Sequence, residues 1–214
     1  MAVKNNLVDR RQFLKGSFAV VFCAVAPVSL VSRTDGDALN LIIEEIRKQD
    51  LLHGYQTDDK DIFYLKKAYN QIMPQNHLEY AVTIACGRQY ACDLGIIDEY
   101  LQRKIGRKGE LYNHKLLELN KWCVPKTYGL LIFKEQELCL LQELISTGRT
   151  KAVELQKGFG PKRLSFVDFY NEVDDEIKTK LGVQVIYDIF HYILSYSVSM
   201  PYYWCSNIIM RAGL

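Results

Sequence analysis

The chain has 214 residues, of which 49% are hydrophobic and 24% are charged, and its formal net charge is +2. Residues 1–33 hold five basic residues and one acidic residue, so the remainder has 22 basic and 24 acidic residues and a formal net charge of −2. Binding to nucleic acid requires a basic face that releases phosphate counterions. The charge balance therefore predicts no nucleic-acid partner.

The first informative segment is a pair of arginines near the start of the chain. Asp9-Arg10-Arg11-Gln12-Phe13-Leu14-Lys15 precedes an uncharged run over residues 16–32. This order resembles a twin-arginine export signal, although that pattern usually has Ser or Thr where this chain has Asp9. The uncharged run is slightly shorter than the ~20 residues that span a bilayer. We therefore expect a signal segment over residues 1–33, which is set apart from the fold.

The export signal has consequences for location. Its expected recognition residues are Arg10, Arg11, Phe13, Leu14 and Lys15, and its expected reader is the twin-arginine translocase. The predicted localisation is periplasmic. Membrane association, either through an uncleaved signal or through a partner, stays open.

Beyond residue 33 the apolar residues recur with the period of an α-helix, and no segment alternates with period two. Helices are expected between Asp37 and Gly54, between Asp58 and Pro74, from Asn76 to Cys86, over residues 91–105, 111–122 and 134–145, between Ser165 and Gly182, and over residues 183–200. Thr57 or Asp58, Asn76 and Ser165 are plausible N-terminal caps. The prediction is an all-α fold: a single irregular domain of about seven to eight helices over residues 34–214.

The segment over residues 189–210 contains no Asp, Glu, Lys or Arg. Its 22 residues are long enough to span a bilayer, but its serines, His191 and Pro201 argue against a span. Large aromatic side chains are favoured at interfaces because they bury much area with few rotatable bonds. Tyr202, Tyr203 and Trp204 are therefore the candidate partner interface. A place in the protein's own core and a membrane location remain the alternatives.

Residues that could perform chemistry are sparse. The histidines are His53, His77, His114 and His191, and none belongs to a recognised metal or haem motif. The five cysteines beyond residue 33 are Cys86, Cys92, Cys123, Cys139 and Cys205, and their pairing stays open. We predict no catalytic, cofactor-binding or metal-binding residue in this chain, with a mixed site of His114 and Cys123 as the open alternative.

Three local sequences resemble one known family. Residues 68–74 (AYNQIMP) are similar to a family helix that ends in an Ile-Pro step. Residues 91–101 (ACDLGIIDEYL) are similar to its Ala-x-x-x-Gly-Val-x-x-Phe-Ile-Asp region, and Phe133 through Leu144 is similar to its Phe-x-x-x-Gln helix. These features, with the export signal, resemble the gluconate 2-dehydrogenase subunit 3 family.

The resemblance implies a non-catalytic small subunit that escorts and stabilises a flavin-dependent dehydrogenase exported by the twin-arginine route. The implied partners are a large flavoprotein subunit, which would carry FAD, and a cytochrome subunit. Two alternatives stay open: an independent periplasmic enzyme that binds a cofactor or metal, and an assembly protein of another redox complex. The substrate of such a complex lies outside this sequence.

Overall fold

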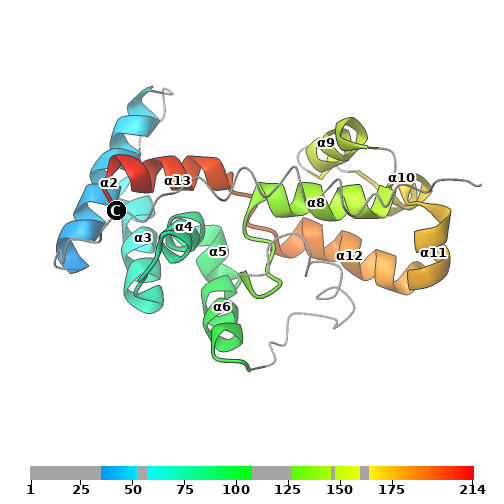
Figure 1. Cartoon of the computed structure of the whole chain (residues 1–214), viewed down its shortest axis with the longest axis horizontal. Coiled ribbons are helices and arrows are strands. Elements are labelled where there is room, and N and C mark those ends of the chain that lie inside the picture. Colours follow the sequence, from blue (N-terminus) through cyan, green and yellow to red (C-terminus); the bar gives the residue numbers. More distant parts are fainter. Residues whose placement is uncertain (1–34, 53–56, 108–126, 146–147, 160–163) are drawn as a thin grey trace, which may run out of the picture.

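The computed structural model of the protein describes residues 35–52, 57–107, 127–145, 148–159 and 164–214, and Figure 1 traces them. The described residues form eleven helices. In chain order these are α2 (Asp35–Leu52), α3 (Asp59–Ile72), α4 (His77–Cys86), α5 (Gln89–Asp93), α6 (Ile96–Lys104), α8 (Lys134–Ile145), α9 (Arg149–Gly158), α10 (Phe166–Glu172), α11 (Asp175–Leu181), α12 (Val183–Tyr196) and α13 (Tyr202–Arg211). No strand lies among these residues, so the predicted all-α class is confirmed.

The predicted helix starts agree with the capping geometry. The carboxylate of Asp58 accepts a hydrogen bond from the backbone N–H of Asp61 at 2.8 Å, which begins α3. The side chain of Asn76 accepts from the N–H of Glu79 at 3.1 Å and begins α4. The hydroxyl of Ser165 accepts from the N–H of Asp168 at 3.1 Å and begins α10. Each cap satisfies a backbone donor that the first helical turn leaves without an intrahelical partner.

The predicted count of seven to eight helices is not confirmed. Two expected helices are divided, α9 and α13 are additional, and the expected helix over residues 111–122 lies outside the described residues. The segment over residues 91–105 breaks at Gly95, whose φ of 69° lies in the left-handed region that glycine tolerates. The helix expected between Ser165 and Gly182 breaks at Asp174, whose carboxylate accepts from the N–H of Glu176 at 2.9 Å and starts α11. Such a local side-chain bond competes with continuation of the preceding helix.

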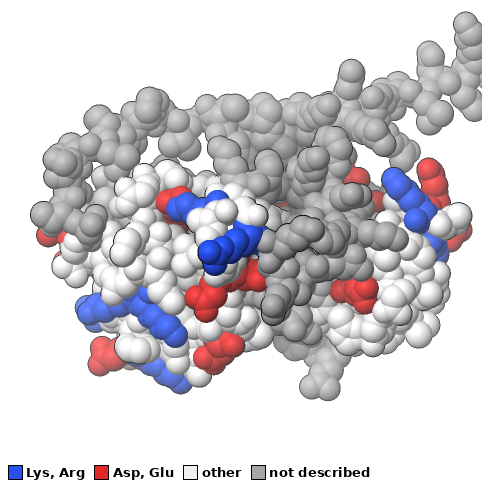
Figure 2. Space-filling model, turned by 90° about the horizontal axis from the view of Figure 1, so that it is seen from below, with Lys and Arg blue, Asp and Glu red and all other residues white. Residues whose placement is uncertain are grey.

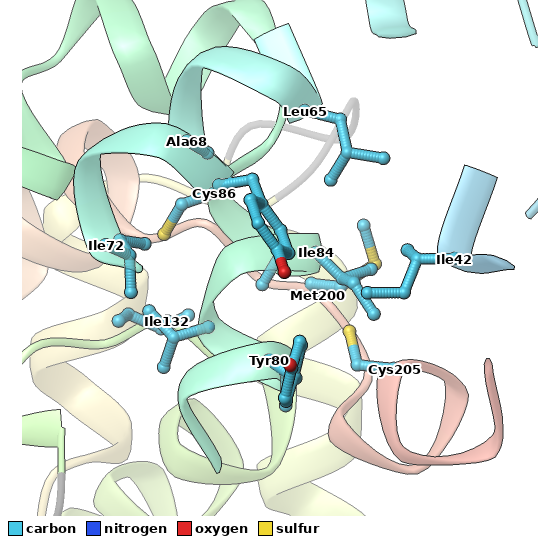
Figure 3. Close-up of a cluster of buried hydrophobic side chains, with 14 of the residues drawn as sticks. Ile42, Leu65, Ala68, Ile72, Tyr80, Ile84, Cys86, Ile132, Met200 and Cys205 are labelled. Carbon is cyan, nitrogen blue, oxygen red and sulfur yellow. The ribbon is translucent and has the colours of Figure 1, made fainter. Parts of the chain in front are cut away.

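The helices surround two hydrophobic cores. The first core is formed by α2 to α6 together with α13, and the second core is formed by α8 to α12. Figure 1 shows the two groups at opposite ends of an elongated molecule, with α13 returning to the first end. Figure 3 shows Ile42 of α2, Leu65 of α3 and Cys205 of α13 in the first core. The last helix therefore closes the core that the first helices begin.

Two short non-helical segments, residues 130–133 and 198–200, connect the two groups of helices. The N–H of Val198 donates to the carbonyl of Leu131 at 3.1 Å, and the N–H of Met200 donates to that of Ile132 at 3.3 Å. A single parallel bridge pairs Phe133 with Met200. Because these segments are bonded to each other, the entry to α8 and the entry to α13 are held side by side.

The uncharged segment over residues 189–210 contributes to both cores. Ile189 and Ile193 of α12 are buried in the second core, while Cys205, Ile208 and Ile209 of α13 are buried in the first. Within the part of the chain that the structure describes, no helix combines the length and apolar character needed to cross a membrane. The signal segment over residues 1–33 lies outside the described residues, and the division at residue 33 stays a prediction.

Candidate functional site

A half-open groove of about 810 Å³ lies in the first group of helices, and we call it the aromatic groove. It is bounded by α2, α3, the junction between α4 and α5, and residues 198–204. Its apolar lining comes from Ile43, Ile46, Ile62, Leu65 and Ile84. Its aromatic lining is Tyr203 and Trp204, and its charged lining is Arg88, Asp50 and Asp61.

The structure separates the three aromatic residues that the sequence indicates as an interface. Tyr203 is 71% exposed and Trp204 is partly buried, and both line the aromatic groove. Tyr202 does not line it, because its ring packs edge-on against Phe133 with centroids 5.0 Å apart. Tyr202 therefore anchors the start of α13, while Tyr203 and Trp204 present aromatic surface to the groove.

The single cationic side chain that lines the groove, among the described residues, is Arg88 at the N-terminal boundary of α5. Its position depends on Gly87, the last residue before it. A Cβ atom at Gly87 would lie 2.7 Å from Cδ1 and 2.9 Å from Cα of Leu65. The absence of a side chain therefore allows α3 to approach the end of α4, which places Arg88 at the edge of the groove.

Two acidic residues also line the groove. Asp50 comes near the end of α2 and accepts a hydrogen bond from the hydroxyl of Thr57. Asp61 is exposed in the first turn of α3, and its side chain also lines the groove. The groove therefore combines aromatic faces, one guanidinium group and two carboxylates above an apolar floor.

Two carboxylates of α8 hold the chain that forms one wall of the groove. Glu137 is 3% exposed and accepts hydrogen bonds from the hydroxyls of Ser197 and Ser199, the latter at 2.9 Å. The side-chain amide of Gln156 donates to the same carboxylate at 2.9 Å. Burial raises the pKa of Glu137, and the bonds from Gln156 and Ser199 oppose that rise. Glu135 accepts from the backbone N–H of Tyr202 at 2.9 Å.

The thiols near the groove are poor nucleophiles. Burial raises the pKa of Cys86 and of Cys205, which keeps both side chains in the thiol form. Among the described residues, no group of three or more His, Cys, Asp or Glu side chains is arranged to hold a metal ion. His114 and Cys123 lie outside the described residues, so the prediction of no metal or cofactor stays untested. The arrangement of the groove suits binding through stacking and hydrogen bonds.

Figure 2 shows the charge distribution on one face of the molecule, where Lys and Arg form separate groups near Asp and Glu. Several cations are also neutralised locally. The ammonium of Lys104 lies 2.6 Å from the carboxylate of Glu79, and buried Arg103 lies 2.5 Å from Glu99. The described residues on this face therefore form no continuous basic surface.

The export-signal residues Arg10, Arg11, Phe13, Leu14 and Lys15 lie outside the described residues, so their role stays untested. Arg88, Gly87, Asp50 and Asp61 were not indicated by the sequence as site residues. No sequence motif marks them, because they come from three separate helical regions that only the fold brings together.

Comparison with known proteins gives a match to a family model. The family model described as the bacterial DNA polymerase III alpha subunit finger domain matches residues 60–175, which is more than half of the chain. The matched part runs from α3 through α10 and therefore includes helices of both cores. No curated protein matches the chain.

This match contradicts the resemblance to the gluconate 2-dehydrogenase subunit 3 family. The structure explains why the three local sequences misled. Met73 ends α3 in a left-handed conformation, Gly95 makes the turn between α5 and α6, and Gln136 bonds to backbone groups beside α8. These are general devices for ending, turning and starting helices, so they do not distinguish one helical family from another.

The functional expectations that rested on that resemblance are also wrong. A polymerase domain does not escort a dehydrogenase, so the flavoprotein partner with its FAD, the cytochrome partner and the alternative redox roles are withdrawn. The exclusion of nucleic acid is wrong as well, because net charge averages over the whole chain and does not describe one local surface. The periplasmic localisation is contradicted, since a domain of a DNA polymerase works in the cytoplasm.

Proposed function

We propose that this chain, which belongs to the family of the bacterial DNA polymerase III alpha subunit finger domain, binds DNA as a helical domain of the replication machinery. The observation that carries the proposal is the match over residues 60–175. The described part of that region is helical, apart from its connecting segments, which is consistent with a rigid binding module.

The charge of residues 60–107, the first part of the matched region, supports a limited contact with phosphates. Residues 60–107 contain seven basic and five acidic residues. Two of the basic residues, Arg103 and Lys104, are paired with Glu99 and Glu79. Lys60, Lys66, Lys67, Arg88 and Arg107 remain as the cations that this region can offer to phosphate groups. Such a set predicts few phosphate contacts and an important contribution from contacts other than charge.

The proposal is tested by titrating the full chain into fluorescently labelled single-stranded DNA, duplex DNA and a duplex with a single-stranded extension, followed by anisotropy. We expect saturable binding with a Kd of about 10⁻⁶–10⁻⁴ M, the ordinary range of sequence-independent binding. The slope of log K against log salt should be roughly −1 to −3, at about −0.7 per neutralised phosphate of a single strand. An absence of binding to all three DNAs up to about 10⁻⁴ M would overturn the proposal.

We also propose that residues 34–214 behave as one folding unit. The support is that α13, which follows the second group of helices, packs against α4 and α2 of the first. Thermal unfolding followed by circular dichroism and by tryptophan fluorescence should then give coincident transitions. Two separated transitions would show that the two cores unfold independently.

A further inference from the structure

We propose that the aromatic groove is a site for an unpaired DNA base, in which Tyr203 and Trp204 stack on the base and Arg88 contacts the adjoining phosphate or the base face. This inference rests on the proposed function and adds to it a site and a class of ligand. Tyr203 and Trp204 lie beyond residues 60–175, so this site extends outside the matched region.

The first step of the argument concerns the aromatic residues. A single exposed tyrosine is common on protein surfaces, because its hydroxyl can bond to water. Tyr203 and Trp204, however, are neighbours in the first turn of α13 and line the same groove. Aromatic side chains that line a groove are the main contacts by which proteins hold single-stranded DNA, because every base has a flat π face. A guanidinium group such as that of Arg88 adds a stacking or cation–π contact.

The second step concerns the rigidity of these aromatic residues. The segment before α13 is held through Ser197 and Ser199 by the buried carboxylate of Glu137. The first N–H of α13, at Tyr202, is bonded to both oxygens of Glu135, at 3.1 and 2.9 Å. The backbone that carries Tyr203 and Trp204 is therefore held in place before a ligand arrives, which lowers the entropic cost of binding.

The third step concerns the carboxylates. Asp50 and Asp61, which both line the groove, make it unfavourable for a run of phosphates, because like charges repel. A carboxylate is instead a good acceptor for the exocyclic amine of cytosine. The groove therefore favours a base, with its phosphate directed toward Arg88 at the edge.

The fourth step concerns size and accessibility. Sites for small ligands usually enclose about 300–1,000 Å³, and the groove encloses about 810 Å³. A paired duplex keeps its bases stacked and cannot present a face to Tyr203. The ligand that fits the observations is therefore single-stranded DNA. An aromatic residue of a protein partner is the competing occupant, and the experiment must separate the two.

The experiment uses the full chain and oligodeoxycytidylate labelled with a fluorophore, with an equally long duplex for comparison. Tyr203→Ala should weaken single-strand binding by roughly 5- to 150-fold, the range that corresponds to loss of one stacking contact. The matched control is Tyr187→Ala, which removes an exposed tyrosine (41% exposed) from α12 in the second core. The affinity of Tyr187→Ala for single-stranded DNA should equal that of the wild type. Circular dichroism of both variants checks that the helices are intact.

A second pair of variants tests the carboxylate. Wild-type protein should bind oligodeoxycytidylate more tightly than oligodeoxythymidylate, because thymine offers an acceptor where cytosine offers an amine. Asp61→Asn should reduce this preference, whereas Asp98→Asn, on α6 and away from the groove lining, should leave it unchanged.

The outcomes are distinguishable. If wild-type protein binds DNA and Tyr203→Ala binds single strands equally well, the base site is wrong while the proposed function stands. If Tyr203→Ala weakens duplex and single-strand binding equally, the groove does not select an unpaired base, and the inference is overturned. If the wild-type protein binds no DNA, the base site and the proposed function are both wrong, and a protein partner becomes the occupant to be sought.

Discussion

At the scale of single residues, the buried side chain of Gln136 organises the start of α8. It is 0% exposed, and its carbonyl oxygen accepts from the N–H groups of Ile132 and Phe133 at 2.9 and 2.8 Å. Its amide donates to the hydroxyl of Thr127 at 2.6 Å and to the carbonyl of Leu130 at 3.0 Å. One side chain therefore satisfies four polar groups of the segment that joins the two cores.

Replacing Gln136 by leucine should lower the free energy of unfolding by about 2–6 kcal/mol, because the buried N–H groups of Ile132 and Phe133 lose their acceptor. Each buried polar group left without a hydrogen bond costs about 1–3 kcal/mol. The control is Gln142→Leu on the same helix, where the side chain is only partly buried and the change should stay within about 0.5 kcal/mol. Urea denaturation measures the free energy of unfolding of both variants. Equal stabilities of the two variants would show that the bonds of Gln136 contribute little.

The buried carboxylate of Glu137 should make stability depend on pH. Its pKa in the folded protein lies above the ordinary value of 4.5, so the folded state binds the proton more tightly than the unfolded state. Its contribution to stability is then fully present below pH 4.5 and is lost as the pH rises through the raised pKa. Glu135 raises this pKa further, while Lys134 lowers it.

Glu137→Gln removes this titration and keeps an acceptor for the serine hydroxyls. Across the window above pH 4.5, the unfolding free energy of the wild type should fall relative to the variant, by up to about 1.4 kcal/mol per pH unit. Denaturation at a series of pH values provides the comparison. Parallel pH profiles for the two proteins would contradict this assignment.

At the scale of elements, α13 depends on a cap that comes from another helix. Pro201 precedes α13 and supplies no side-chain hydrogen bond to its first turn. The carboxylate of Glu135, on α8, accepts from the N–H of Tyr202 instead. A negative group at this position also interacts favourably with the positive end of the helix dipole. The contact therefore couples the second group of helices to the helix that completes the first core.

Glu135→Ala should destabilise the protein by about 0.5–2 kcal/mol, the usual cost of losing an N-terminal cap. Glu143→Ala is the matched control, because Glu143 lies on the same helix and is exposed. The midpoint of thermal unfolding compares the two variants. A loss in Glu143→Ala as large as that in Glu135→Ala would mean that the cap is not the cause.

Much of the helical pattern could be predicted from periodicity and caps, as Asp58 and Asn76 illustrate. Two helices, α9 and α13, could not be predicted in this way. The helix α9 buries only Ala152 and Leu155 among its described side chains, so its apolar pattern is weak. The start of α13 was interpreted as an aromatic tail, because its three leading aromatic residues mask the helical spacing of buried Ile208 and Ile209.

At the scale of the whole molecule, the groove shows what the sequence could not supply. Tyr203 and Trp204 stood out because large aromatic residues in an uncharged segment are conspicuous. Arg88 and Asp61 did not, because isolated charged residues between apolar helices are usually solvated. These charged residues meet Tyr203 and Trp204 only because α13 returns to the first core after the chain has formed the second. That return is a long-range packing event with no local signal.

The charge of the whole molecule also led to the wrong prediction that the chain has no nucleic-acid partner. A formal net charge near zero is a sum over the whole chain, so it does not exclude a groove that holds a base by stacking. The matched region over residues 60–175 and the groove beside α3 and α4 together make DNA the expected ligand.

The most direct test of the central claim, that this chain binds DNA through the aromatic groove, is photocross-linking to single-stranded DNA that carries halogenated pyrimidines. The cross-linked peptides of the full chain are then identified by mass spectrometry. The account predicts cross-links at Tyr203 or Trp204 that disappear when unlabelled single-stranded DNA is added in excess. Cross-links confined to α8–α12, or none that unlabelled DNA removes, would contradict it.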